Sequence, residues 1–177
     1  MNYEKSLYIK LRNELRSHLN KEIIVVCIGT DRSTGDSLGP LVGSFLSDLN
    51  LKNIKIYGTI DDPIHAMNLD DRLNNIKNNH PESYVICIDA CLGKMKSIGK
   101  IIIESEPIKP GKGMKKELQE YGDCSVKGVV NISGYKEYWV LQSTRLSLVI
   151  KMAREITHMI KMLDQYISRK LRAFQEV

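Results

Sequence analysis

Two aspartates stand out because each comes shortly after an apolar run of the chain. Asp36 lies in the glycine-rich loop CIGTDRSTGDSLGP, residues 27–40, and Asp89 lies in CIDACLG. Two carboxylates that share one cleft can share a proton or hold a metal ion, and their proximity separates their pKa values. One can then act as a general base on water while the other acts as a general acid. The pair predicts acid–base chemistry, and Asp36 and Asp89 are the candidate catalytic residues.

A third group of polar residues follows the apolar run 54–60 and contains Asp62 and His65. A histidine at this place can bind a metal ion or carry a proton, and it can equally well pack beside the start of a helix. No cofactor is expected. If a divalent metal is bound, the sequence offers Asp36, Asp89 and His65 as its ligands.

Polar and glycine residues near the aspartates are candidates for contact with a substrate, because glycine leaves room for a ligand beside the backbone. Asp36 also stands where a helix N-cap is expected, since Pro40 fits the first turn of a helix that begins near Leu38. Asp31 either supports Asp36 or is a solvated loop residue. The substrate-loop candidates are Asp31, Gly35, Gly39, Asp62, His65, Gly93, Gly111 and Gly113.

Several other kinds of site lack their signature in this sequence. The loop 27–40 has neither the GK[ST] ending of a phosphate loop nor GxGxxG spacing, so nucleotide binding is disfavoured. No GxSxG segment is present, which argues against a serine hydrolase. The spacing of the cysteines fits neither a zinc site nor a disulfide framework, and we expect small buried hydrophobes. The four cysteines are Cys27, Cys87, Cys91 and Cys124.

Buried strands that alternate with amphipathic helices must position these residues. Apolar runs rich in β-branched residues predict strands, and helical spacing of apolar residues predicts helices. The alternation predicts an α/β fold, a three-layer α/β/α sandwich with a mainly parallel sheet. Ligands bind outside the carboxyl ends of the strands in such a sheet, where both aspartates are expected. The predicted strands cover 22–29, 54–60, 83–91, 99–105 and 127–133, and the predicted helices cover 4–19, 38–49, 65–78 and 143–170.

Length and composition limit the classes of protein that fit. The chain has 177 residues, 42% of them hydrophobic, which suits a single α/β domain over 1–177 with an N-terminal helix in 1–20 and a C-terminal helix in 143–170. No apolar run is long enough to span a membrane and no signal peptide is apparent, so we expect a cytoplasmic protein without membrane contact. The net charge of +5 comes with few aromatic residues. Direct nucleic-acid binding is therefore not expected, and a homo-oligomer stays open.

Several segments resemble those of known families. TGDSLGP, DACLG and PGKGMKK, in this order, resemble motifs of the spore germination protease, and DDPIHAMNL and VVNISGYKEYWVLQSTRL resemble the sporulation protein YyaC family. The resemblance implies a fold like that of the hydrogenase-maturation endopeptidases. It also implies a location in the forespore or spore core and small acid-soluble spore proteins as substrates. The catalytic aspartates implied by the germination protease fall on Asp36 and Asp89.

The hydrogenase-maturation endopeptidases raise the question of a metal. Their matching acidic positions help to bind nickel together with a later histidine, but this sequence has no histidine between His80 and His158. His65 would have to substitute for it. The favoured function is a sporulation-associated endopeptidase whose two aspartates activate water against a peptide bond. The alternatives are a metal-recognising maturation-type protease specific for one partner, and a non-catalytic sporulation protein that binds a peptide or partner.

Overall fold

A five-stranded sheet forms the middle layer of the computed structural model, which describes residues 3–108, 120–134 and 136–175. The strand order is β2-β1-β3-β5-β4. β1 pairs in parallel with β2 and β3, β3 pairs in parallel with β5, and β4 is antiparallel to β5. The mainly parallel sheet is therefore confirmed. The strands are β1 Ile23–Cys27, β2 Ile54–Tyr57, β3 Tyr84–Gly93, β4 Ile101–Glu104 and β5 Cys124–Ile132.

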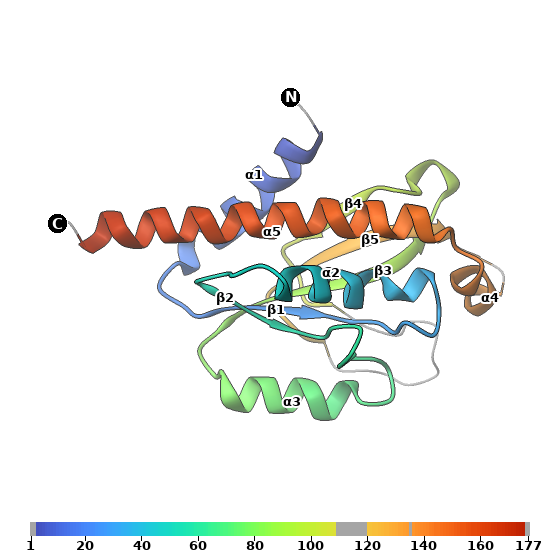
Figure 1. Ribbon diagram of the computed structural model, residues 1–177, viewed down its shortest axis with the longest axis horizontal. Helices are drawn as coiled ribbons and strands as arrows, with labels where there is room; N and C mark the ends of the chain where they lie inside the picture. The colour runs from blue at the N-terminus through green and yellow to red at the C-terminus, as the bar shows by residue number, and fades with distance from the viewer. Residues whose placement is uncertain (1–2, 109–119, 135, 176–177) are drawn as a thin grey trace.

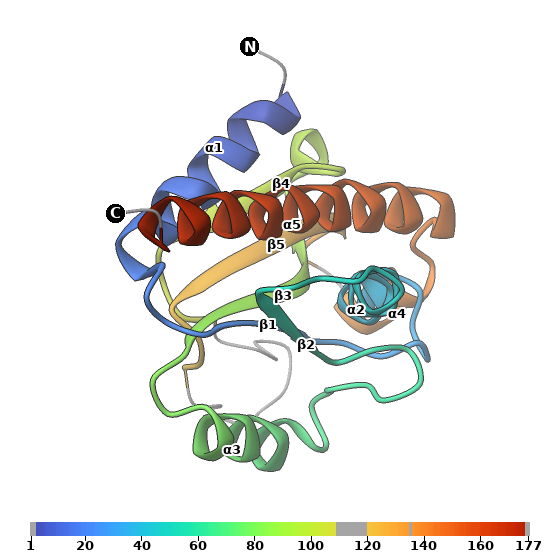
Figure 2. The same cartoon turned by 60° about the vertical axis from the view of Figure 1, so that its left-hand side comes forward.

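Helices cover both faces of this sheet, as the sequence predicts (Figure 1). Figure 2 shows α1, α2 and α5 on one side of the sheet and α3 on the other. The buried side chains fall into two clusters that match these two layers. The helices are α1 Tyr3–Leu15, α2 Leu38–Ser47, α3 Leu69–Asn79, α4 Glu137–Gln142 and α5 Leu146–Gln175.

The central strands contribute side chains to both clusters, because successive residues of a strand point to opposite faces. All five residues of β1 are buried. Val25 and Cys27 belong to the cluster under α1, α2 and α5, whereas Ile24 and Val26 belong to the cluster under α3. A strand buried on both faces has no place for polar chemistry along its length. Polar side chains are therefore placed where the strands end.

The C-terminal helix α5 lies along one face of the sheet (Figure 1). The apolar stripe predicted for it is buried, and the buried residues on this stripe are Val149, Met152, Ala153, Ile156, Met159, Ile160 and Leu163. The buried carboxylate of Asp164 accepts hydrogen bonds from the backbone N–H groups of Lys52 and Asn53, at 3.1 and 2.7 Å. This contact ties α5 to the chain just before β2. Among the described residues, no helix has the length and apolar character needed to cross a membrane.

Two element boundaries differ from their predictions for local reasons. The strand predicted over 54–60 ends at Tyr57, because Gly58 has φ +84° and a Cβ there would lie 2.0 Å from the carbonyl oxygen of Cys27. The helix predicted over 65–78 begins at Leu69. The side chain of Asn68 accepts a hydrogen bond from the N–H of His65 at 2.9 Å, which holds the preceding segment in a turn.

The observed bounds of the two strands beyond β3 also differ from the predicted ones. β5 begins at Cys124, three residues before its predicted start at 127, and β4 covers only Ile101–Glu104 of the predicted 99–105. The N-terminal helix ends at Leu15 and continues as a 3-10 turn over Arg16–His18. The short helix α4 was not predicted, because six residues are too few for a helical period to stand out.

Candidate functional site

The carboxyl ends of β1 and β3 lie side by side, which confirms the expected proximity of the first and third apolar runs. Cys27 pairs with Ile88 in register, and the N–H of Ile28 donates to the carbonyl of Ile88 at 2.8 Å. The chain leaves β1 at this point toward Asp36, and Asp89 follows Ile88 directly. The parallel pairing of the two strands thus brings both aspartates to one edge of the sheet.

Asp89 lies on the α3 side of the sheet. Val85 and Cys87 belong to the buried cluster on this side, and Asp89 continues the same alternating row of β3. The carboxylate of Asp89 accepts a hydrogen bond from the N–H of Ala90 at 2.8 Å. A row of apolar side chains therefore ends in a partly buried carboxyl group at the edge of the sheet.

Asp36 is held by the backbone of the loop that follows β1. Its carbonyl accepts a hydrogen bond from the N–H of Thr30 at 3.1 Å. Gly29 has φ +141°, and a Cβ there would lie 2.0 Å from the carbonyl oxygen of Asp36, so this close crossing of the loop requires glycine.

The predicted N-cap role of Asp36 is wrong. Asp36 lies in the 3-10 turn Gly35–Ser37, and the residue that precedes α2 is Ser37. The Ser37 hydroxyl donates to the carbonyl of Thr34 at 2.7 Å instead of capping the helix. Within the described residues, the carboxylate of Asp36 accepts no hydrogen bond.

The two carboxyl groups interact electrostatically. Burial raises the pKa of Asp89 well above its ordinary value, and the negative charge of Asp36 raises it further. Burial also raises the pKa of Asp36, but the neighbouring imidazole of His65 opposes this shift. The upward pKa shift is the larger one for Asp89, so Asp89 binds a proton more readily than Asp36. Two neighbouring carboxyl groups with unequal pKa values have the chemistry that a general base and a general acid require.

His65 reaches the same edge because the segment after β2 docks beside β1. Ile64 forms an isolated parallel bridge with Ile28, and its carbonyl accepts from the N–H of Gly29 at 2.8 Å. The Nδ1 of His65 accepts a hydrogen bond from the N–H of Met67 at 3.2 Å. The structure therefore brings His65 close to Asp36, while its imidazole also helps to fix the turn before α3.

The other polar candidates lie apart from the pair. Asp62 is exposed and accepts from Arg72 at 2.7 Å, and this ion pair lowers the pKa of Asp62. Asp31 is exposed in the loop that carries Asp36. Neither residue shares the environment of Asp36 and Asp89.

Close packing accounts for the glycines near the pair. A Cβ on Gly39 would lie 2.1 Å from the carbonyl oxygen of Ile28, so glycine lets α2 approach the end of β1. Cβ atoms on Gly35 and Gly93 would lie 2.9 Å from side-chain atoms of Leu141 and Val129. Protein atoms thus fill the space beside these three glycines. Gly111 and Gly113 lie outside the described residues.

Lys127 and Glu104 join the site without having been predicted. Lys127 pairs in register with Asp89 across β3 and β5, and its ammonium forms an ion pair with Glu104 on β4. The sequence signal was a lone lysine in the apolar run KGVVNIS, which an exposed strand residue explains as well. Cys91 is also near Asp89, and burial raises the pKa of its thiol to about 11, so it stays a thiol at neutral pH.

An exposed aromatic pair flanks the Asp36 loop. Tyr138 and Trp139 on α4 are 65% and 63% exposed, and their rings meet edge to face at 5.7 Å. α4 packs on the turn that carries Asp36 through the contact of Leu141 with Gly35. Large exposed apolar side chains beside a candidate site are typical of surfaces that contact another molecule.

A metal ion needs several ligand side chains gathered around one point. In the part of the chain that the structure describes, no group of three or more His, Cys, Asp or Glu side chains is arranged to hold a metal ion. The set Asp36, Asp89 and His65, which the sequence offers as ligands, does not form such a group.

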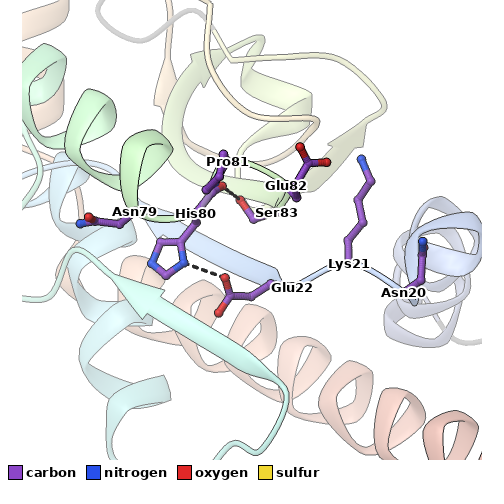
Figure 3. Close-up of a pocket in the computed structure, with 8 residues that line it drawn as sticks. All are labelled: Asn20, Lys21, Glu22, Asn79, His80, Pro81, Glu82 and Ser83. Carbon is purple, nitrogen blue, oxygen red and sulfur yellow. Dashed lines mark hydrogen bonds and ion pairs between the residues drawn. The ribbon is translucent and has the colours of Figure 1, made fainter.

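A polar hollow of about 350 Å³ lies at the opposite edge of the sheet (Figure 3). His80 borders it, with Nδ1 2.6 Å from Glu22 and Nε2 2.7 Å from the hydroxyl of Tyr57. Glu22 also pairs with Lys55 at 2.7 Å. These contacts tie the end of α3 to the start of β1 and to the end of β2, so His80 has a structural role at the edge opposite the aspartate pair.

The fold places the chain in a known class of α/β proteins. It superposes on the [NiFe] hydrogenase maturation protease HycI from Thermococcus kodakarensis KOD1 with a TM-score of 0.62, over 88% of this chain and 99% of that one, at 16% identity. The expected likeness to the hydrogenase-maturation fold is therefore confirmed.

The chain belongs to the family described as "Protein of unknown function (DUF1256)", which matches residues 1–159. It is 48% identical over 161 residues to "Uncharacterized protein YyaC" of Bacillus subtilis (strain 168), a match that covers 91% of this chain and 78% of that protein. The resemblance to the YyaC family is confirmed. The relation to the spore germination protease stays a prediction.

Proposed function

We propose that this protein is an aspartate-dependent endopeptidase. The observation that carries the proposal is the pairing of Asp36 and Asp89 at the carboxyl edge of the sheet, where burial and the charge of Asp36 raise the pKa of Asp89 well above its ordinary value. An ionised and a protonated carboxyl group side by side are the two partners that water-mediated hydrolysis of an amide requires.

Each carboxyl group takes one step of the reaction. Asp36 accepts a proton from water as the water oxygen bonds to the peptide carbonyl carbon, whose oxygen becomes an oxyanion. When this intermediate collapses, the carbon–nitrogen bond breaks and Asp89 gives its proton to the leaving nitrogen. Exchange of a proton between the two carboxyl groups then restores the starting state.

The substrate we propose is a protein or peptide, and small acid-soluble spore proteins are the first candidates, acted on in the forespore or spore core. The resemblance to sporulation proteins motivates this choice. The exposed Tyr138 and Trp139 beside the Asp36 loop support a peptide ligand, because aromatic side chains provide contact area for an apolar segment.

Cleavage by variants of the pair tests the proposal. Purified wild type, Asp36→Asn and Asp89→Asn are incubated with small acid-soluble spore proteins and with a random peptide mixture, and products are identified by mass spectrometry. Asp48→Asn, an exposed carboxylate at the far end of α2, is the matched control. Wild type and Asp48→Asn should cleave, and both pair variants should be reduced by at least about a hundredfold.

A chelator arm separates the two kinds of protease. Loss of wild-type cleavage with chelator, and its return with a divalent metal, would favour the metal-recognising alternative over a pair of carboxyl groups acting alone. A folded wild type that cleaves neither substrate preparation would contradict the endopeptidase and favour the non-catalytic binding protein.

A further inference from the structure

Lys127 occupies the position on β5 that is paired with Asp89 on β3. Paired residues of parallel strands point to the same face of the sheet, so the Lys127 side chain leaves the sheet beside the Asp89 carboxyl group. Its positive charge acts on both Asp89 and Cys91. Lys127 is thus a cation within electrostatic reach of the aspartate pair.

Glu104 on β4, the strand next to β5, forms an ion pair with Lys127. Ile101 and Ile103 of β4 point into the core under α1, α2 and α5, so Glu104 lies on the opposite face with Lys127. The Lys127 ammonium forms an ion pair with the Glu104 carboxylate, and their side chains are 26% and 42% exposed. Because an ammonium group has three N–H donors, this ion pair leaves donors for a second acceptor.

A peptide carbonyl attacked by water needs such a donor. Its oxygen becomes an oxyanion, and a fixed positive group beside it lowers the free energy of the transition state more than that of the bound substrate. Among the side chains whose charge acts on Asp89 or Cys91, Asp36 and Glu104 are acidic, and Lys127 is the cation. Lys127 has the charge and the donors that this role requires.

We propose that Lys127 is a catalytic residue that holds the oxyanion formed at the scissile carbonyl, with Glu104 as the positioning residue that fixes its ammonium group. This role rests on the proposed endopeptidase function. It adds Lys127 on β5 to Asp89 on β3 and to Asp36 in the loop that follows β1.

Kinetics of Lys127 variants test this role on the substrate that wild type cleaves best. Lys127→Met keeps the unbranched stem of the side chain and removes its charged group, so kcat should fall on the order of a hundredfold to a thousandfold with little change in KM. Lys127→Arg keeps the charge and should recover part of the lost kcat. Glu104→Gln weakens the anchor but leaves the ammonium in place, so its kcat should lie between those of wild type and Lys127→Met.

The folded state of each variant is checked by thermal unfolding, so that a lost activity is not mistaken for a lost structure. A folded Lys127→Met with wild-type kcat would overturn the role of Lys127 while leaving the endopeptidase intact. A fall in kcat that Lys127→Arg does not relieve at all would also overturn it, because charge is then not what matters. If wild type cleaves no substrate, the endopeptidase itself fails, and that result is seen before any variant is compared.

Discussion

Asp89 and Lys127 occupy directly paired positions of β3 and β5, on the α3 side of the sheet. A lysine so close to a carboxyl group would usually hold its pKa low. Burial and the charge of Asp36 nevertheless raise the pKa of Asp89 well above its ordinary value. Lys127 opposes this shift, but its effect on the pKa of Asp89 is smaller than those of burial and of Asp36.

The raised pKa of Asp89 predicts how stability depends on pH. The folded state binds the Asp89 proton more tightly than the unfolded state, so its contribution to stability is fully present below the ordinary aspartate pKa. This contribution is lost as the pH rises through the raised pKa of the folded state. Asp89→Asn should therefore flatten the fall in the free energy of unfolding over that range, measured by urea denaturation at several pH values. An unchanged pH dependence in Asp89→Asn would contradict the prediction.

The ionisation of Asp89 should depend on Asp36. Asp36→Asn removes the negative charge that raises the pKa of Asp89, so that pKa should move down toward its ordinary value without reaching it, because burial remains. Carbon NMR titration of the aspartate carboxyl groups measures the shift. Asp31→Asn, at an exposed position in the same loop, should leave the pKa of Asp89 unchanged. Equal shifts in both variants would argue against a specific contact between Asp36 and Asp89.

If the two aspartates divide the work as proposed, the rate of cleavage should also depend on pH. The value of kcat/KM should rise as Asp36 ionises and fall as Asp89 loses its proton, which gives a bell-shaped profile. Because the raised pKa of Asp89 sets the falling limb, that limb should lie well above the ordinary pKa of an aspartate. A profile that rises with pH and shows no falling limb would contradict Asp89 as the general acid.

Trp139 should affect substrate binding more than stability. Its side chain is 63% exposed, so Trp139→Ala should change the free energy of unfolding by only about 0.5 kcal/mol. The KM for a cleaved peptide should rise about tenfold, because a contact of roughly 1.4 kcal/mol is lost. Leu171→Ala, an exposed apolar position near the end of α5, is the control and should leave KM unchanged. A Trp139→Ala variant with wild-type KM would exclude the aromatic pair from binding.

Gly39 should be intolerant of alanine although it lies in a helix. Alanine favours a helix over glycine by about 1 kcal/mol, but a Cβ at Gly39 would lie 2.1 Å from the carbonyl oxygen of Ile28. The strain should outweigh the gain, and Gly39→Ala should lower the free energy of unfolding by about 1–3 kcal/mol in thermal or urea unfolding. Gly134→Ala, which meets no atom within 4 Å but has φ +133°, measures the cost of backbone strain without a clash, whereas Gly39→Ala measures the clash. A stabilised Gly39→Ala would mean that α2 does not approach β1 so closely.

The sequence by itself determined the layers and the edge at which the aspartates lie. Apolar runs such as 22–29 and 83–91 are strands buried on both faces, and such strands pair in parallel between helices. Parallel strands end at a common edge, so residues that follow them are brought together without knowledge of any contact. The proximity of Asp36 and Asp89 could be predicted for this reason.

The tertiary structure decided which side chains surround the pair. Whether Lys127 faces Asp89 depends on the register between β3 and β5, and a shift of one residue would turn it to the other face. The ion pair of the half-buried Lys127 with Glu104 likewise depends on β4 lying antiparallel beside β5. Register and strand order follow from the packing of the whole core, whereas the local sequence fixes only which residues are apolar. The sheet edge at which the aspartates lie could therefore be predicted from the sequence, whereas the side chains that surround Asp89 could not.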